Sequence, residues 1–101
     1  MTRISINLLW SIIMQTEYKY NCRVCGLRQD EPIWGEDGNS PSYDICPCCG
    51  VEFGYGDTTI DNCKAIRKDW IAKGMKWSFP EEKPSNWSWD EQKKHIPPKY
   101  R

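Results

Sequence analysis

The sequence predicts a small α+β domain that a metal ion holds together, with a zinc ribbon, then one amphipathic helix, then a tryptophan-rich C-terminal arm. Three observations support this prediction: two C-x-x-C pairs in the first half, a segment of helical periodicity after them, and four of the six tryptophans after residue 69. A chain of 101 residues buries too little apolar surface to be comfortably stable unaided. A bound ion would supply the missing stability.

The two cysteine pairs are Cys22-Arg-Val-Cys25 and Cys46-Pro-Cys-Cys49, separated by 20 residues and each followed by glycine. A tight turn directs both thiolates of one pair at one ion, and a second such turn completes a tetrahedron. The glycines permit a positive φ that brings backbone N–H groups toward the sulfurs. We therefore predict one structural Zn²⁺ at Cys22, Cys25, Cys46 and Cys49. Four cysteine ligands leave no open coordination position, so zinc catalysis is not expected.

The sequence alone leaves several alternatives to this zinc site open. The same cysteines could form two disulfides, which would staple little chain, or hold iron instead of zinc. Cys48 lies between two predicted ligands and could replace Cys49 or remain a free thiol, although Cys46 and Cys49 reproduce the spacing of the first pair. Cys63 is expected to be a buried packing residue. A redox pair between Cys48 and Cys63 is the sharper alternative.

Residues 1–13 form an apolar N-terminal extension unlike the rest of the chain. The apolar run at residues 4–13 is too short to span a bilayer, and no small-residue cleavage site follows it. Met14 opens a polar stretch that leads into the first cysteine pair, so translation from Met14 rather than Met1 is an open alternative. Without an export signal we expect the reducing cytoplasm and no membrane attachment.

Residues 14–57 are predicted to form the zinc ribbon, with short strands at 18–21, 27–34, 42–45 and 51–55 around a loop at 35–41 rich in turn-forming residues. Residues 58–101 are predicted to be the helix and wrapping tail of the same domain. The helix covers residues 58–73, with Thr58 or Thr59 as its N-cap and Gly74 as its C-cap. Its apolar face is formed by Ile60, Cys63, Ile66, Trp70 and Ile71.

The tail is predicted to start with an extended arm at residues 75–87, because Pro80 and Pro84 prevent a helix there. Trp77 and Trp87 should pack this arm onto the ribbon. Ser88 and Glu91 have the spacing of a capping box, which predicts a short helix running to about residue 96. His95, the single histidine, has no catalytic partner in sequence and should lie at the surface.

Charge is divided unevenly along a chain whose formal net charge is zero. Residues 1–63 carry nine acidic and four basic groups, and residues 64–101 carry five acidic and ten basic groups. The simplest consequence is attraction between the two halves within one fold. The alternative is nucleic-acid binding, for which the candidate contacts are basic residues of the second half, namely Lys64, Arg67, Lys68, Lys73 and Lys76.

The two knuckle sequences, residues 18–26 and Ile45-Cys-Pro-Cys-Cys-Gly-Val51, resemble those of rubredoxins. That resemblance implies a small ribbon fold and iron-based electron transfer. Over residues 18–96 the chain is similar to small uncharacterised bacterial cysteine-rich proteins with a CPCC motif, on the basis of residues 42–50 and 52–55, then Trp70, Gly74, Trp77 and Trp87. This second resemblance implies a rubredoxin-like zinc ribbon and a bacterial source, and it brings no activity.

The function expected from these observations is that of a protein-interaction module with a structural zinc ion, and not that of an enzyme. Trp34, Glu36 and Asp37 are the predicted contact surface, with another protein as partner. An iron electron carrier of the rubredoxin kind is the first alternative. A nucleic-acid-binding zinc ribbon and a toxin-immunity partner are further alternatives.

Overall fold

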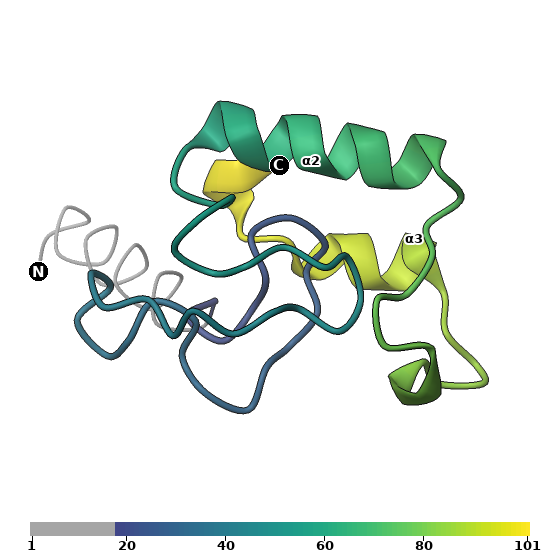
Figure 1. Ribbon diagram of the computed structural model, residues 1–101, viewed down its shortest axis with the longest axis horizontal. Coiled ribbons are helices and arrows are strands. Elements are labelled where there is room, and N and C mark those ends of the chain that lie inside the picture. The colour runs from purple at the N-terminus through teal and green to yellow at the C-terminus, as the bar shows by residue number, and fades with distance from the viewer. Residues whose placement is uncertain (1–17) are drawn as a thin grey trace, which may run out of the picture.

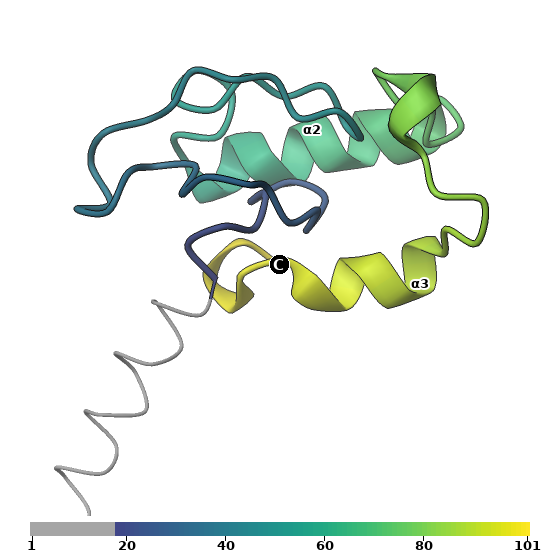
Figure 2. The same cartoon turned by 90° about the horizontal axis from the view of Figure 1, so that it is seen from below.

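The computed structural model describes residues 18–101, so the predicted extension at residues 1–13 lies outside the described part. The described elements are α2 (Ile60–Ala72), α3 (Trp89–Gln92) and three short 3-10 helices, η1 (Pro80–Glu82), η2 (Lys93–His95) and η3 (Pro98–Tyr100). Figure 1 shows α2 and the α3–η2 segment running in opposite directions, and Figure 2 shows the first cysteine loop between them. None of the described helices is long and apolar enough to cross a membrane.

The two cysteine loops have the same backbone structure. In the first, the N–H of Gly26 donates to the carbonyl of Cys22 (2.9 Å), and in the second the N–H of Gly50 donates to the carbonyl of Cys46 (2.9 Å). Both glycines have left-handed φ values, +85° and +83°. We call these two turns, residues 22–26 and 46–50, the knuckles. Each is a tight loop in which glycine supplies a conformation that other residues adopt at a cost.

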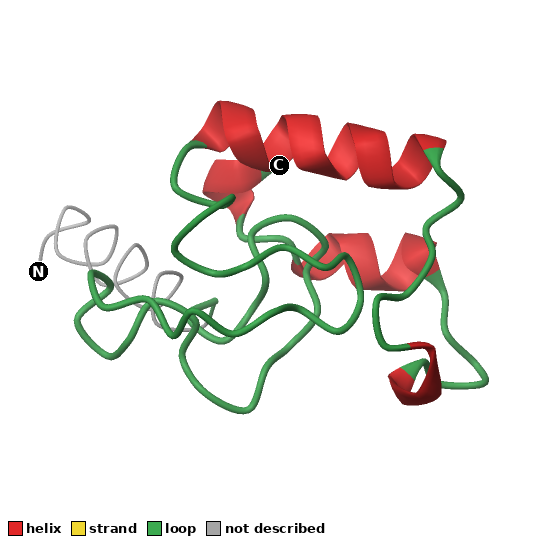
Figure 3. Ribbon diagram, in the orientation of Figure 1, coloured by secondary structure: helices red, strands yellow, loops and turns green. Residues whose placement is uncertain are grey.

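The strands predicted around the knuckles are reduced to single bridges. Asn21 pairs with Arg28, and Ile45 pairs with Glu52, both antiparallel and both at the base of a knuckle. Figure 3 accordingly draws the cysteine loops as loop, with helix confined to the second half of the described chain. The prediction of extended strands over 18–21, 27–34, 42–45 and 51–55 was therefore wrong in extent. The alternating pattern marked hairpins that each support one bridged pair.

Helix α2 occurs where the periodicity predicted it. The side chain of Thr59 caps its start by accepting from the N–H of Asn62 (3.1 Å). The C-cap is Lys73 and not Gly74 as predicted; Gly74 is the next residue and has a left-handed φ of +99°. Cys63 and Trp70 are buried as predicted. Ile60 and Ile71 are exposed, at 36% and 41%, which corrects their assignment to the buried face. The buried stripe is narrow and consists of Cys63 and Trp70, with Ile66 partly buried beside them.

The C-terminal arm carries the tryptophans back onto the knuckles, as predicted. The N–H groups of Ser78 and Phe79 donate to the carbonyls of Cys48 (3.0 Å) and Pro47 (2.9 Å), which fixes the arm against the second knuckle. Four indole rings then pack edge to face, with ring centroids 5.1 to 6.4 Å apart, in the pairs Trp70–Trp87, Trp70–Trp89 and Trp77–Trp87. Ser88 caps α3 through the N–H of Glu91 (3.3 Å), as the capping box predicted.

The core is built around the knuckles themselves. Phe53 and Val24 are its largest fully buried apolar side chains, and Ile33, Val51, Trp70 and Trp77 complete it together with buried cysteines. The predicted attraction between the acidic and basic halves does not take the form of ion pairs. Each of the four salt bridges among residues 18–101 joins groups of the same half. The halves are held instead by apolar packing and by hydrogen bonds to backbone carbonyls.

Candidate metal centre

The sulfurs of Cys22, Cys25, Cys46 and Cys49 converge at the centre of the fold, all within 4.8 Å of one another. The sulfurs of Cys22 and Cys49 are 3.7 Å apart, and those of Cys25 and Cys46 are 3.6 Å apart. A regular tetrahedron with metal–sulfur bonds of about 2.3 Å has edges of about 3.8 Å, so the donor set fits such an ion. The four cysteines are thus positioned to hold a metal ion, with two ligands from each knuckle.

All six cysteines of the chain are free thiols, so neither C-x-x-C pair forms a disulfide. The ligand sulfurs are much farther apart than the roughly 2.05 Å of a disulfide bond. Three of the four clustered cysteines are fully buried, and Cys49 is partly exposed. An ion held by these four sulfurs would therefore be surrounded almost entirely by protein, with Cys49 on the side nearest to solvent.

The thiols of the cluster influence one another's ionisation strongly. Burial raises the pKa of the Cys25 thiol well above its ordinary value. A hydrogen bond shared with Cys22 raises the pKa of the Cys49 thiol. The pKa of the Cys46 thiol is lowered, because the thiols of Cys22, Cys25 and Cys49 hydrogen-bond to it. A bound dication would favour the ionised form of all four sulfurs, because a thiol must lose its proton to become a metal ligand.

Several polar groups contact the cysteine sulfurs and fix the knuckles. The backbone N–H of Val24 donates to the sulfur of Cys22 (3.4 Å), and the side-chain amide of Gln29 donates to the sulfur of Cys46 (3.6 Å). From α3, the amide of Gln92 donates to the carbonyl of Cys25 (3.1 Å). Its oxygen accepts from the indole N–H of Trp87 (2.8 Å). Such contacts orient ligands and moderate their negative charge.

Arg67 of α2 ties the helix to the first knuckle and to the C-terminus. Its guanidinium donates to the carbonyls of Val24 (2.6 Å) and Arg23 (3.0 Å), and also to that of Tyr100 (2.6 Å). Burial lowers the pKa of Arg67, and its proximity to the sulfurs of Cys63 and Cys22 opposes that shift. The guanidinium remains charged, as arginine does in proteins. It places positive charge beside a cluster that is negative when metallated.

This inward position corrects the role considered for Arg67 in nucleic-acid binding. Its donors already serve three backbone carbonyls. Lys73, another member of that set, forms an ion pair with Asp69 (2.9 Å) on the helix surface. Lys64, Lys68 and Lys76 are exposed. No feature of the sequence distinguished Arg67 from these surface lysines, because its partners are more than 30 residues away along the chain.

Asp57 is a second structural residue that sequence reasoning missed. Its side chain is fully buried and accepts from the backbone N–H of Gly54 (2.7 Å) and the indole N–H of Trp34 (2.9 Å). The guanidinium of Arg23 stacks on the Trp34 ring, 4.3 Å from its centroid, and donates to the Asp57 carbonyl (3.0 Å). Trp34, predicted as an exposed contact residue, is thus half-buried and used for packing, whereas Glu36 and Asp37 are exposed.

The two remaining cysteines are both fully buried. Cys48 lies outside the group of four, and its sulfur accepts from the side-chain amide of Gln92 (3.4 Å). Cys63 faces the core from α2, where burial, reinforced by the charge of Asp57, raises its pKa to about 12. Cys63 is thus a neutral, poorly nucleophilic thiol at neutral pH. No disulfide joins Cys48 to Cys63. His95 is exposed, as predicted.

No family model and no solved structure matches the chain. Two curated proteins of Bacillus subtilis (strain 168) are similar to it. The uncharacterized protein YozI is 33% identical over 81 residues, which cover 64% of this chain and 67% of YozI. The uncharacterized protein YoaQ is 32% identical over 81 residues, which cover 64% of this chain and 68% of YoaQ. This chain, with its four-cysteine cluster, therefore belongs to the same bacterial family as YozI and YoaQ.

Proposed function

We propose that this protein is a structural zinc module that binds another protein. Cys22, Cys25, Cys46 and Cys49 hold the ion, and the resulting fold is a rubredoxin-like zinc ribbon of the CPCC type. The observation that supports this most directly is the convergence of four sulfurs within 4.8 Å at the centre of the core. Four cysteine ligands saturate zinc, which leaves no position for a substrate or an activated water.

The metal's role in this proposal is to stabilise the fold. The described part has two single bridges in place of a sheet, and its core is formed around the knuckles. A structural zinc site contributes on the order of 10 kcal/mol to folding, which is comparable to the whole stability of a small domain. We therefore expect removal of the metal to unfold the knuckles. The six free thiols suit the reducing cytoplasm, where we place the protein.

The test is elemental analysis of protein purified without added metal, combined with its visible absorption spectrum and with two matched variants. We expect one zinc per chain, no colour, and loss of tight zinc binding in Cys49→Ser. Cys48→Ser is the matched control, because Cys48 is buried next to Cys49 but lies outside the group of four. Retention of zinc by Cys49→Ser together with its loss from Cys48→Ser would contradict the assigned ligands.

The alternative function is an iron electron carrier, and the same elemental analysis and visible spectrum distinguish it from the structural zinc module. Thiolate-to-iron charge-transfer bands and a reversible redox couple would replace the zinc proposal with this alternative. Protein without any bound metal, purified under reducing conditions, would contradict both.

A further inference from the structure

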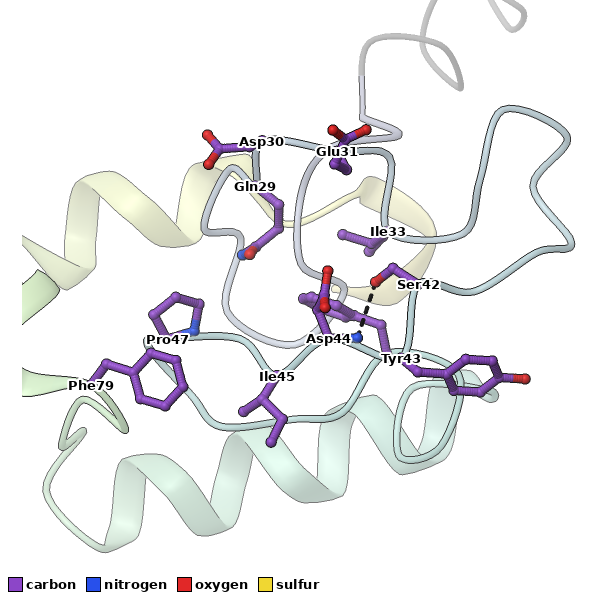
Figure 4. Close-up of a pocket in the computed structure, with 11 residues that line it drawn as sticks. Gln29, Asp30, Glu31, Ile33, Ser42, Tyr43, Asp44, Ile45, Pro47 and Phe79 are labelled. Carbon is purple, nitrogen blue, oxygen red and sulfur yellow. Dashed lines mark hydrogen bonds between the residues drawn. The ribbon is translucent and has the colours of Figure 1, made fainter.

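An acidic groove lies between the two knuckle hairpins and shares one residue, Gln29, with the surroundings of the metal centre. It has a volume of about 690 Å³. One wall is formed by Gln29, Asp30, Glu31 and Ile33, and the other by Ser42, Tyr43, Asp44, Ile45 and Pro47. Phe53 also lines it, and Phe79 of the arm stands next to Pro47 at one end (Figure 4). Two of its lining residues, Ile45 and Tyr43, are exposed at 47% and 60%. The groove therefore combines open apolar surface with charge.

The charge in the groove is negative and unneutralised. Asp30 and Glu31 stand at the upper rim in Figure 4, and Asp44 rises from the opposite wall. The lining contains no lysine, arginine or histidine. Within residues 18–101 these three carboxylates form no ion pair and accept no hydrogen bond. Like charges held together without a counter-charge favour a cationic partner.

The acidic residues of the adjacent loop differ in this respect. Glu36 pairs with Lys19 (2.6 Å). Asp37 accepts from the N–H of Asn39 (2.9 Å) and the hydroxyl of Ser40 (3.0 Å), and these hydrogen bonds lower its pKa. The carboxylates at the groove are therefore the more available ones. This distinction provides a matched control within the same molecule.

The groove also has an open backbone edge. The bridge between Ile45 and Glu52 is flanked by hydrogen bonds from Cys46 to Val51 and from Phe53 to Asp44, so the N–H and C=O of Ile45 point away from Glu52. Neither group of Ile45 takes part in a hydrogen bond made within the described residues. An unpaired edge of this kind is a template for an added extended segment.

We propose that this groove binds an extended, lysine- or arginine-rich segment of a partner protein. The segment's backbone pairs with Ile45, its apolar side chains pack against Ile45 and Phe79, and its basic side chains meet Asp30, Glu31 and Asp44. This inference rests on the proposed role as a protein-binding zinc module and specifies the surface that role uses.

The test is an amide NMR titration of the ¹⁵N-labelled full chain, loaded with zinc, using a capped peptide of alternating lysine and valine of about seven residues, the length of an ordinary strand. We expect saturable shifts at residues 29–31 and 43–46 and slower hydrogen exchange at the Ile45 amide. The triple variant Asp30→Asn, Glu31→Gln, Asp44→Asn should weaken binding about tenfold, as expected for three partly exposed charge contacts. The control variant Glu36→Gln, Asp37→Asn should leave the affinity unchanged.

A second peptide, methylated on alternate backbone nitrogens, keeps every charge but cannot complete the backbone pairing. We expect it to bind poorly. The proposal would be overturned if both peptides bound equally well, or if the triple and control variants weakened binding equally. Either result would mean that the peptide binds through general negative charge on the surface and not through this groove.

Other occupants of the groove are distinguished in the free protein. Slow exchange of the Ile45 amide without peptide would mean that the groove is already filled. Filling that does not depend on concentration would assign it to residues 1–17 of the same chain, and filling that does would assign it to a second copy. Either result would overturn binding of a partner. Metal content measured on the same sample separates the zinc proposal from the groove proposal. Protein that contains zinc but does not bind the peptide would contradict only the proposed binding in the groove.

Discussion

Replacing Gly26 by alanine tests how closely the C-terminal helix is packed on the first metal knuckle. A Cβ atom at Gly26 would lie 2.6 Å from the carbonyl oxygen of Gln92 and 2.9 Å from the amide nitrogen of Ile96. Both are backbone atoms, which cannot move without displacing the α3–η2 segment. Gly38 is the matched control, because its φ of +75° is also left-handed but a Cβ there would meet nothing within 4 Å.

The expected magnitudes follow from these two environments. A left-handed φ costs alanine about 1 to 2 kcal/mol at either position. Displacing packed backbone adds about 1 to 3 kcal/mol at Gly26 alone. We therefore expect Gly38→Ala to lower the free energy of unfolding by about 1 to 2 kcal/mol and Gly26→Ala to lower it by about 2 to 5 kcal/mol. The displacement should also weaken the contact of Gln92 with Cys25.

The assay is urea unfolding of the zinc-loaded chain followed by tryptophan fluorescence, since four indole rings report on the packing of the arm. The midpoint and the slope are compared for the parent and both variants. If the two variants agree within about 0.5 kcal/mol, the ordinary limit of additivity for independent sites, then α3 is not held against the knuckle and the packing described above is wrong.

Three further predictions concern residues that sequence reasoning missed or left open. Asp57→Asn should lower the free energy of unfolding by about 1.5 to 3 kcal/mol, because the single oxygen of an amide replaces the two oxygens that accept from the N–H groups of Gly54 and Trp34. An unchanged urea midpoint would contradict this. Arg67→Met should destabilise by roughly 2 to 4 kcal/mol, with little rescue by Arg67→Lys, because one ammonium cannot span three carbonyls; full rescue in thermal melts would contradict it. Folding raises the pKa of Cys63 from 9.0 to about 12, so the contribution of its neutral thiol to the free energy of unfolding is complete below pH 9 and is lost as the pH rises toward 12. Cys63→Ala should therefore make the free energy of unfolding decline less steeply over this alkaline range.

The features predicted correctly from the sequence are those formed between residues close to one another along the chain. The cap at Thr59 and the cap at Ser88 are each made with a residue three positions later. The knuckles are similar, because Cys22 and Gly26 bond within one turn. Spacing and residue type alone are sufficient for such features.

What the sequence could not predict depends on contacts between distant residues. Arg67 and Lys68 are adjacent and alike in sequence, yet Arg67 faces inward because Arg23, Val24 and Tyr100 offer carbonyls there. Asp57 resembles any acid of an exposed turn until the fold brings Trp34 beside it. The predicted strands were too long for a related reason. Alternation of apolar and polar residues shows which residues prefer an extended backbone, but not how many of them will pair with a neighbouring strand.

The contacts that cover the two knuckles have a consequence for the order of events during synthesis. All four ligand cysteines have been made by residue 49, whereas the segments that cover them, Ser78 and Phe79 on one knuckle and Gln92 to Ile96 on the other, come at least 29 residues later. A growing chain therefore presents an open pair of hairpins to the metal before the tail exists to enclose them. Once the tail has docked, backbone and side-chain contacts cover both knuckles, and only Cys49 remains partly exposed. We therefore expect an ion held by the four cysteines to exchange more slowly from the folded protein than from the open hairpins.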